Sequence, residues 1–184
     1  MDRHGSGHRT KAVEMPQLVV PSLRAHRSFL DALGEYHAEG LHQDLAVEDI
    51  DEPAAFHAWV EQLRVAGLDG TADFDRDRVP HRIMWWVCGE DYIGRVRINL
   101  ELNDELLEFG GHVGYDIRPS ARRQGHATAL LTASLREAGS LGLKLALLTC
   151  APDNVASRKV IERNGGVLRD TSRAGRLRYW CATT

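Results

Sequence analysis

The chain has 184 residues, of which 43% are hydrophobic and 27% charged, with a formal net charge of −3. This length favours one well-buried domain and is short for two. The small negative charge argues against a nucleic-acid partner. No apolar run reaches the roughly 18 residues that a membrane span needs, so no membrane partner is expected.

Cysteine usage and the N-terminus suggest a compartment. Cys88, Cys150 and Cys181 are an odd number at wide spacing, in apolar runs. They indicate reduced thiols in a cytoplasmic protein rather than a disulfide framework or a zinc site, so we expect no metal. The start of the chain is polar and lacks an apolar signal segment. We predict a disordered tail over residues 1–15 and a single domain over 16–184.

The first part of the domain shows one strand pattern and two helix patterns. A short strand is expected over 18–20, and apolar residues recur at helical spacing over 23–37 and 53–65. Residues 44–52 hold five acids and no base. That run indicates either a solvated loop or an acidic lip that attracts cationic amines.

The middle of the chain predicts a loop and a hairpin. Residues 67–80 are polar and rich in Gly and Asp, which favours a loop. Strand patterns over 83–88 and 92–100 flank Gly89-Glu90-Asp91, a hairpin signal. Trp85 and Trp86 are adjacent, so their side chains should lie on opposite faces of the sheet.

The most informative stretch is Arg122-Arg123-Gln124-Gly125-His126-Ala127, between a strand pattern over 112–117 and a helix pattern over 127–141. The first N–H groups of a helix have no intrahelical partner, and the helix dipole favours an anion there. Gly125 lets the backbone approach phosphate closely. Over 116–184, 12 Lys or Arg face five acids, which suits a polyanionic ligand. Taken alone, the turn equally fits an ordinary helix N-terminus.

The segment after this helix pattern predicts a second strand and a second helix. A nearly continuous apolar run over 143–150 predicts a buried strand, and Asp153 or Asn154 can cap a helix that Gly165 ends. Strand, helix and strand form a crossover unit with strands pointing the same way. Two last strands are expected over 166–169 and 176–182. The sum is a mixed sheet with helices on both faces.

Two motifs at this separation carry a family resemblance. The Arg-x-x-Gly-x-Ala turn is followed by Cys150-x-x-x-Asn154-x-x-Ser157 and then Glu162-x-Asn-Gly-Gly. This resembles the GNAT superfamily of N-acetyltransferases, in the bacterial branches whose second helix reads Asn-x-x-Ser. The match covers about residues 83–184. It implies an α/β (α+β) fold with a mostly antiparallel twisted sheet, helices on both faces and a splayed parallel strand pair.

The resemblance also implies acetyl-coenzyme A as co-substrate. The motif strand would pair with the pantetheine arm, the N–H near Ile117 would polarise the thioester carbonyl, and the turn would surround the pyrophosphate. Gly114 suits either a bulge in that strand or tight packing of the strand on a helix. The expected cofactor-binding residues are Tyr115, Asp116, Ile117, Arg122, Arg123, Gln124, Gly125, His126, Ala127, Thr128, Asn154 and Ser157.

The catalytic residues are harder to assign. By resemblance, Ser157 lies near the sulfur, as proton donor or as a hydrogen-bond partner of the thiolate. Ile161 stands where other branches carry the Tyr that acts as general acid. Tyr115 and Tyr179 are the alternatives for that role. His112 and Glu108 are the candidate bases, and Glu101, which ends the preceding strand pattern, is an alternative; each could act through a water.

The acceptor is not evident from these motifs. The favoured interpretation is direct acetyl transfer, in a ternary complex, to a primary amine of a small molecule such as an amino acid, an antibiotic or a polyamine. A protein N-terminus or lysine is one alternative, and a non-catalytic acyl-coenzyme A-binding module is another. Exposed strands at the C-terminus are compatible with a homodimer.

Overall fold

The computed structural model describes residues 14–65 and 79–183, so the predicted tail over 1–15 and loop over 67–80 fall almost wholly outside the described residues. In these two segments, strands form two sheets, ordered β1-β2-β3-β4 and β5-β7-β6. The strands are β1 (Gln17–Val19), β2 (His81–Cys88), β3 (Asp91–Asn99), β4 (Val113–Ile117), β5 (Leu145–Cys150), β6 (Val167–Thr171) and β7 (Leu177–Ala182). The main helices are α1 (His26–Ala38), α2 (Pro53–Val65), α3 (His126–Ser140) and α4 (Val155–Arg163).

The helix predictions agree well with the structure. The stretch over 23–37 forms a 3-10 turn, η1 (Leu23–Ala25), that runs into α1, and α2 has the predicted bounds. Asn154 caps α4 by accepting a hydrogen bond from the Ser157 N–H. Gly165, at φ 78°, follows the end of α4 in the left-handed conformation.

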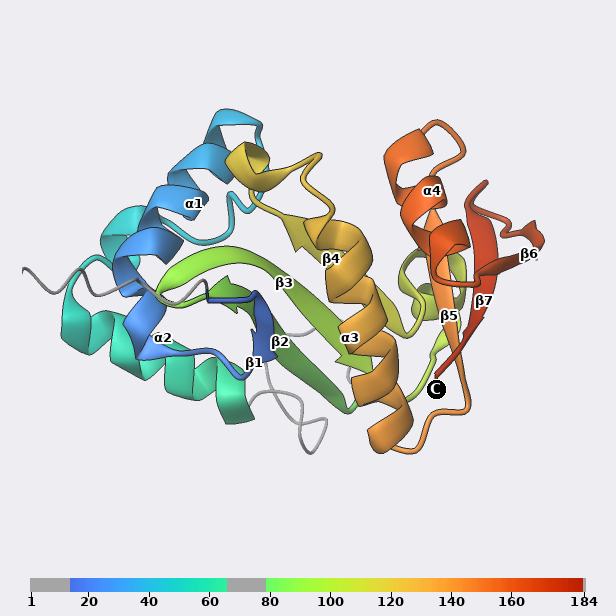
Figure 1. Ribbon diagram of the computed structural model, residues 1–184, viewed down its shortest axis with the longest axis horizontal. Coiled ribbons are helices and arrows are strands. Elements are labelled where there is room, and N and C mark those ends of the chain that lie inside the picture. Colours follow the sequence, from blue (N-terminus) through green and yellow to red (C-terminus); the bar gives the residue numbers. More distant parts are fainter. Residues whose placement is uncertain (1–13, 66–78, 184) are drawn as a thin grey trace, which may run out of the picture.

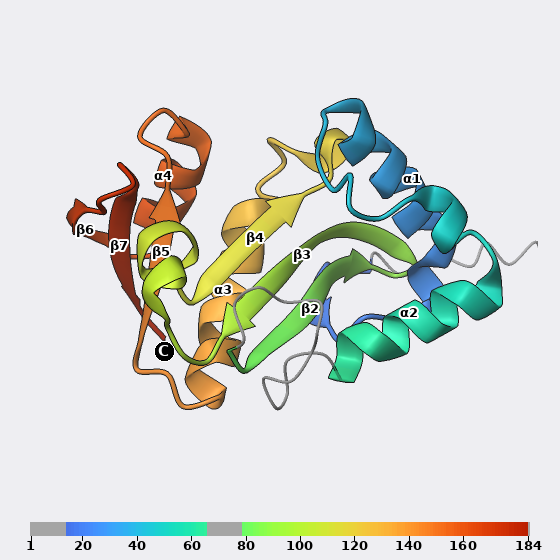
Figure 2. The same ribbon diagram turned by 180° about the vertical axis from the view of Figure 1, so that it is seen from behind.

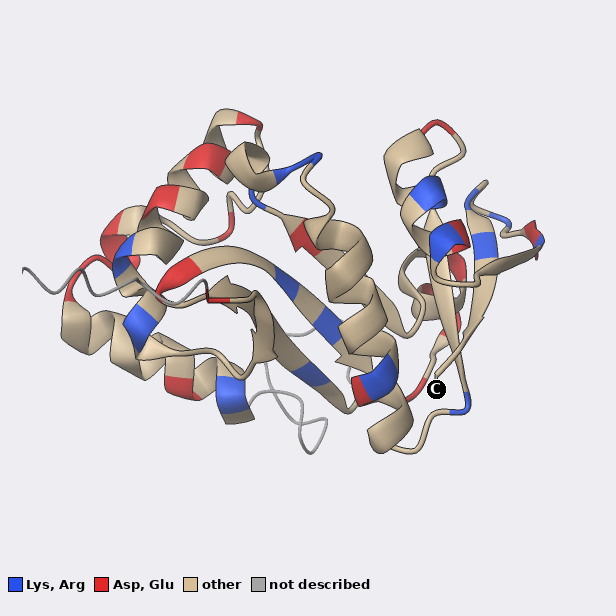
Figure 3. Cartoon of the chain, viewed as in Figure 1, with Lys and Arg blue, Asp and Glu red and all other residues tan. Residues whose placement is uncertain are grey.

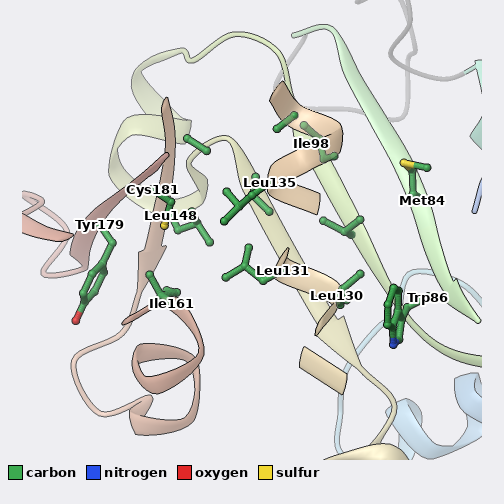
Figure 4. Packing of buried hydrophobic residues seen from close by; sticks show 14 of the residues in the cluster. Met84, Trp86, Ile98, Leu130, Leu131, Leu135, Leu148, Ile161, Tyr179 and Cys181 are labelled. Carbon is green, nitrogen blue, oxygen red and sulfur yellow. The ribbon is translucent and has the colours of Figure 1, made fainter. Parts of the chain in front are cut away.

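Helices cover both faces of the four-stranded sheet (Figure 1). On one face, α1 and α2 enclose a cluster that includes Phe29, Phe56 and Trp85. On the other face, α3 buries Leu130, and Trp86 belongs to this second cluster (Figure 4). The neighbouring tryptophans therefore face opposite sides, as the strand period requires.

The two sheets meet at the start of β4 and separate beyond it. The His112 N–H donates to the Leu147 carbonyl at 2.7 Å, and the Leu147 N–H donates to His112 Nδ1 at 2.9 Å. Past this point β4 and β5 diverge, as Figure 2 shows, and they belong to different sheets. The predicted α/β fold with mostly antiparallel sheets and helices on both faces is confirmed. Every strand pair in the described segments is antiparallel, so β4 and β5 do not form a parallel ladder there.

Gly114 does not behave as predicted. The register of β3 and β4 runs without a shift from Gly94 opposite Ile117 to Ile98 opposite Val113, so there is no bulge there. Gly114 is exposed, and a Cβ on it would meet nothing within 4 Å, so tight packing is also wrong. The separation of β4 from β5 begins instead after Gly111 and His112, where hydrogen bonds to Leu147 hold the chain against β5.

Gly111 makes this close contact between the chain and β5 possible. It has φ 80°, and a Cβ there would overlap the Leu147 carbonyl oxygen. We predict that Gly111→Ala lowers the free energy of unfolding by about 2–4 kcal/mol, from overpacking and backbone strain together. Gly175→Ala is the control, because Gly175 has φ 77° but open space around its Cα. Equal losses in urea denaturation of both variants would contradict the role of the close contact.

Candidate active site

The turn before α3 presents a run of unused backbone donors. No backbone hydrogen bond joins the five N–H groups from Arg123 to Ala127 to another residue of the described segments. Arg123 has φ 64° and Gly125 has φ 87°, and left-handed residues in such a turn make successive N–H groups converge. With the N-terminus of α3 behind it, this turn is a concave site for an anion.

Two residues predicted to bind the anion, Arg122 and Thr128, form hydrogen bonds with other parts of the protein instead. Arg122 donates from Nε to the Ile117 carbonyl at 3.0 Å and from Nη1 to Glu39 at 2.9 Å. The Thr128 N–H donates to the Gly125 carbonyl at 3.1 Å. Figure 3 shows acidic positions along α1 and basic ones in the turn before α3. In this state Arg122 therefore ties that turn to the end of α1.

Two side chains of the turn have partners that orient them. Gln124 donates to the Ser120 carbonyl at 3.1 Å. Trp86 Nε1 donates to His126 Nδ1 at 3.4 Å. Because an indole N–H can only donate, His126 Nδ1 must accept, and a neutral ring then carries its proton on Nε2. The exposed Arg123 side chain leaves its charge available at the turn.

The backbone of β4 has one bonded edge and one open edge. The Arg118 N–H donates to the Ile93 carbonyl, and the Asn99 N–H donates to the His112 carbonyl. Antiparallel pairing alternates, so Gly114 and Asp116 share the bonded edge with these pairs. The N–H groups of Tyr115 and Ile117 point to the open edge beside β5. Of the three predicted strand residues, two therefore offer backbone groups to a ligand in the split, and Asp116 does not.

Opposite this edge, α4 brings Ser157 to Tyr115. Their hydroxyl oxygens are 3.2 Å apart. Burial raises the pKa of Tyr115 to about 12, although the Ser157 hydrogen bond opposes this, so the phenol stays protonated at neutral pH. Ile161 is only 1% exposed and belongs to the core. Tyr179 is buried and donates to Glu162. Tyr115 is thus the tyrosine whose hydroxyl contacts Ser157.

The two candidate bases lie near the closed end of the split. His112 is buried, which lowers its pKa, and its Nδ1 accepts the Leu147 N–H. Glu108 lies in η3 (Leu106–Gly110), a short π-helical turn. Its carboxylate accepts the Ala174 N–H at 3.1 Å. Both side chains are therefore held by backbone groups of neighbouring segments rather than by the Tyr115–Ser157 pair.

The Asp116 side chain anchors a polar cluster on the face of β4 covered by α1. Its carboxylate accepts from Tyr36 Oη at 2.7 Å and from Arg95 Nε at 3.0 Å, and lies 3.3 Å from His42 Nε2. Burial alone would raise the pKa of Asp116, but the hydrogen bond from His42 and the charge of Arg95 hold it below its usual value. The sequence patterns did not predict this cluster, because its residues are up to 80 positions apart and carry no motif.

Metal-binding groups and membrane-spanning helices are both absent from the described part of the chain. Over 14–65 and 79–183, no three His, Cys, Asp or Glu side chains are grouped so that they could hold a metal ion. Within the same segments, no helix is both long and apolar enough to cross a membrane.

The match to a protein family defines an enzyme of the N-acetyltransferase class. The family model for the acetyltransferase (GNAT) domain matches residues 27–167. The chain therefore belongs to the GNAT acetyltransferase family. No curated protein matches it in sequence.

Solved structures share this fold at low sequence identity. The microcin C7 self-immunity acetyltransferase MccE, in complex with acetyl-CoA and AMP, is 14% identical, with 91% of this chain and 92% of that chain covered and a TM-score of 0.60. RimJ of Mycobacterium smegmatis, in complex with CoA-disulfide, is 16% identical, with 92% and 83% covered and a TM-score of 0.64. A spermidine N-acetyltransferase chimera from Vibrio cholerae and hSSAT is 13% identical, with 91% and 95% covered and a TM-score of 0.58.

The charged state of Asp116 gives a pH-dependent prediction. A carboxyl whose folded pKa is lowered contributes stability above its ordinary pKa of 3.8 and loses it as pH falls through the folded value. Asp116→Asn should therefore cost about 1–3 kcal/mol of unfolding free energy at pH 7. The difference from wild type should shrink below pH 4, as roughly expected from carboxyl titration.

Urea denaturation at pH 7 and at about pH 3 measures this difference. Asp170→Asn is the control. Asp170 lies on the exposed strand β6 and pairs with Arg178 of β7, so its effect should be smaller. A penalty for Asp116→Asn that is the same at both pH values would contradict an ionised Asp116.

Proposed function

We propose that this enzyme transfers an acetyl group from acetyl-coenzyme A to the primary amine of a small molecule, by direct attack in a ternary complex. The observation that carries the cofactor assignment is the run of unused N–H groups from Arg123 to Ala127. A pyrophosphate in this turn would accept several of them, with the helix dipole adding to the attraction. From there, the pantetheine arm would run along the open edge of β4.

This placement puts one hydrogen-bond donor near the carbonyl oxygen of the thioester and others near its sulfur. The Ile117 N–H at the open edge would stabilise the oxyanion that forms when the amine attacks the thioester carbon. When the carbon–sulfur bond breaks, the Tyr115–Ser157 pair would hydrogen-bond the thiolate and supply a proton. Asn154, which caps α4, would hold the pantetheine arm. His112 and Glu108 stay the candidate bases, acting through water.

A cavity on the face of the sheet covered by α1 and α2 supports a small-molecule acceptor. It measures about 420 Å³ and is lined by α1, α2, the segment between these helices, and strands β2 and β3. The lining includes Tyr36, His42 and Arg95. These three residues contact Asp116 of β4, so the cavity adjoins the strand that would carry the thioester. Its volume falls in the range of small-molecule sites, about 300–1,000 Å³.

Gly125 tests the cofactor assignment. A Cβ on Gly125 would meet nothing within 4 Å in the free protein, so Gly125→Val adds bulk to the turn without a clash when no ligand is bound. We expect Gly125→Val to abolish the rise in melting temperature that coenzyme A gives the wild type. Gly142→Val is a matched control, because Gly142 follows α3, has φ 96° and has open space. Retained stabilisation in Gly125→Val would place the cofactor elsewhere.

The Tyr115–Ser157 pair tests the chemistry. We predict that Ser157→Ala and Tyr115→Phe each lower kcat by about 10–100-fold, the order of a lost proton donor, with the KM for acetyl-coenzyme A changed less. Thiol release during turnover measures both constants. Ser140→Ala serves as the control, because Ser140 is exposed at the far end of α3. Unchanged kcat in both variants would remove the pair from the reaction.

A further inference from the structure

The acceptor cavity, defined above by α1, α2, β2 and β3, is polar at one end and apolar at the other. Its polar end is the Asp116 cluster beside β4. At its apolar end, on the side of β2 and α2, the partly buried apolar residues Leu45, Trp59, Leu63 and Ile83 line the cavity. Gln62 and His81 lie among them, and Arg97 is the cross-strand partner of Ile83. An acceptor that reaches β4 with its amine would therefore place the rest of its body against apolar side chains.

The apolar end is held by packing that exists before any ligand binds. The Trp59 ring lies 4.9 Å from Phe29 and 6.1 Å from Trp85, measured between centroids. Phe29 in turn stacks on Trp85 at 5.1 Å. Aromatic contacts of this kind fix the orientation of a ring. The exposed part of Trp59 is thus a preformed surface for a flat or branched apolar group.

The polar end carries no spare negative charge. The Asp116 carboxylate is ion-paired with Arg95 at 3.0 Å. Arg95 also donates to His42 Nδ1 at 2.8 Å, and since a guanidinium can only donate, that nitrogen accepts and the neutral ring keeps its proton on Nε2, facing Asp116. Arg97, the other guanidinium in the lining, donates to Asn99. Among the described residues, the acids that line the cavity are Asp44 and Asp49, and both are exposed.

We propose that the acceptor is a monoamine with an apolar body, such as an arylalkylamine or a branched alkylamine. This inference rests on the proposed function and names the substrate class of the same site. The exposed acids Asp44 and Asp49 attract the incoming ammonium, and the apolar end takes the body. A second ammonium, as in a polyamine, would lie against Trp59 and Leu63 in a cavity that also holds the Arg95 and Arg97 guanidinium groups, and it would lose hydration there.

Acetyl transfer from acetyl-coenzyme A to phenethylamine, isoamylamine, spermidine and a tetrapeptide with a free N-terminus tests this directly. We expect kcat/KM for the two apolar monoamines to exceed that for spermidine by about tenfold or more. Phenethylamine should also raise the melting temperature of the coenzyme A-bound protein, and spermidine should not. A preference for spermidine or for the peptide, in turnover or in binding, would overturn the inference.

Two variants of α2 make the test specific to the cavity. Trp59→Ala should raise the KM for phenethylamine by about tenfold or more, without changing the stabilisation by coenzyme A. Leu63→Glu places a carboxylate at the apolar end, and should weaken phenethylamine and improve spermidine while the protein keeps its fold. His57→Glu adds the same charge on the exposed side of α2 and should change neither. If Leu63→Glu leaves the ratio of the two amines unchanged, the inference is wrong.

Failure of the inference can be told apart from failure of the proposed function. If coenzyme A does not stabilise the wild type, or if no amine is acetylated, the proposed transfer reaction is contradicted. If coenzyme A binds and an amine is acetylated, the order of the amines alone decides the inference. Binding of phenethylamine to the coenzyme A-bound protein tests whether the cavity accepts an apolar monoamine, even without turnover.

Discussion

The separation of β4 from β5 is the constraint on which the site depends. Hydrogen bonds between His112 and Leu147 hold the strands together at one end, and Gly111 allows the close contact because it has no Cβ. Beyond this point β4 leaves the N–H groups of Tyr115 and Ile117 without a neighbouring strand. A ligand with its own amide groups can occupy that edge as an extra strand would. The same strand directs Asp116 to the opposite face, where the acceptor cavity lies.

Contacts between α1 and the segment before α3 connect the turn before α3 with the cavity that α1 lines. Glu35 accepts from Arg118 and from the Ser120 N–H, and Glu39 pairs with Arg122 at 2.8 Å. The turn before α3 is thus held by contacts with α1, a helix that also lines the cavity. Arg122 illustrates the consequence, since in the free protein it binds α1 rather than projecting into the turn.

Local sequence signals predicted much of this arrangement. Periodicity located α2 to the residue, and the Gly125 turn and the Asn154 cap were found because each depends on a few adjacent residues. The signals failed where a property depends on pairing across the fold. The absence of a bulge at Gly114 and the alternation that turns the Asp116 backbone away from the split both depend on the register with β3. The Tyr36–His42–Arg95–Asp116 cluster joins α1, β3, β4 and the segment after α1 through side chains that carry no pattern along the chain.

The central claim is that the cofactor occupies the open edge of β4 and the turn before α3. Amide hydrogen exchange measured by NMR, with and without acetyl-coenzyme A, tests it most directly. We expect fast exchange for Tyr115, Ile117 and residues 123–127 in the free protein, with slowing on addition of the cofactor, whereas Asp116 exchanges slowly in both states. Slowing confined to other residues, with Tyr115, Ile117 and the turn unchanged, would contradict the claim.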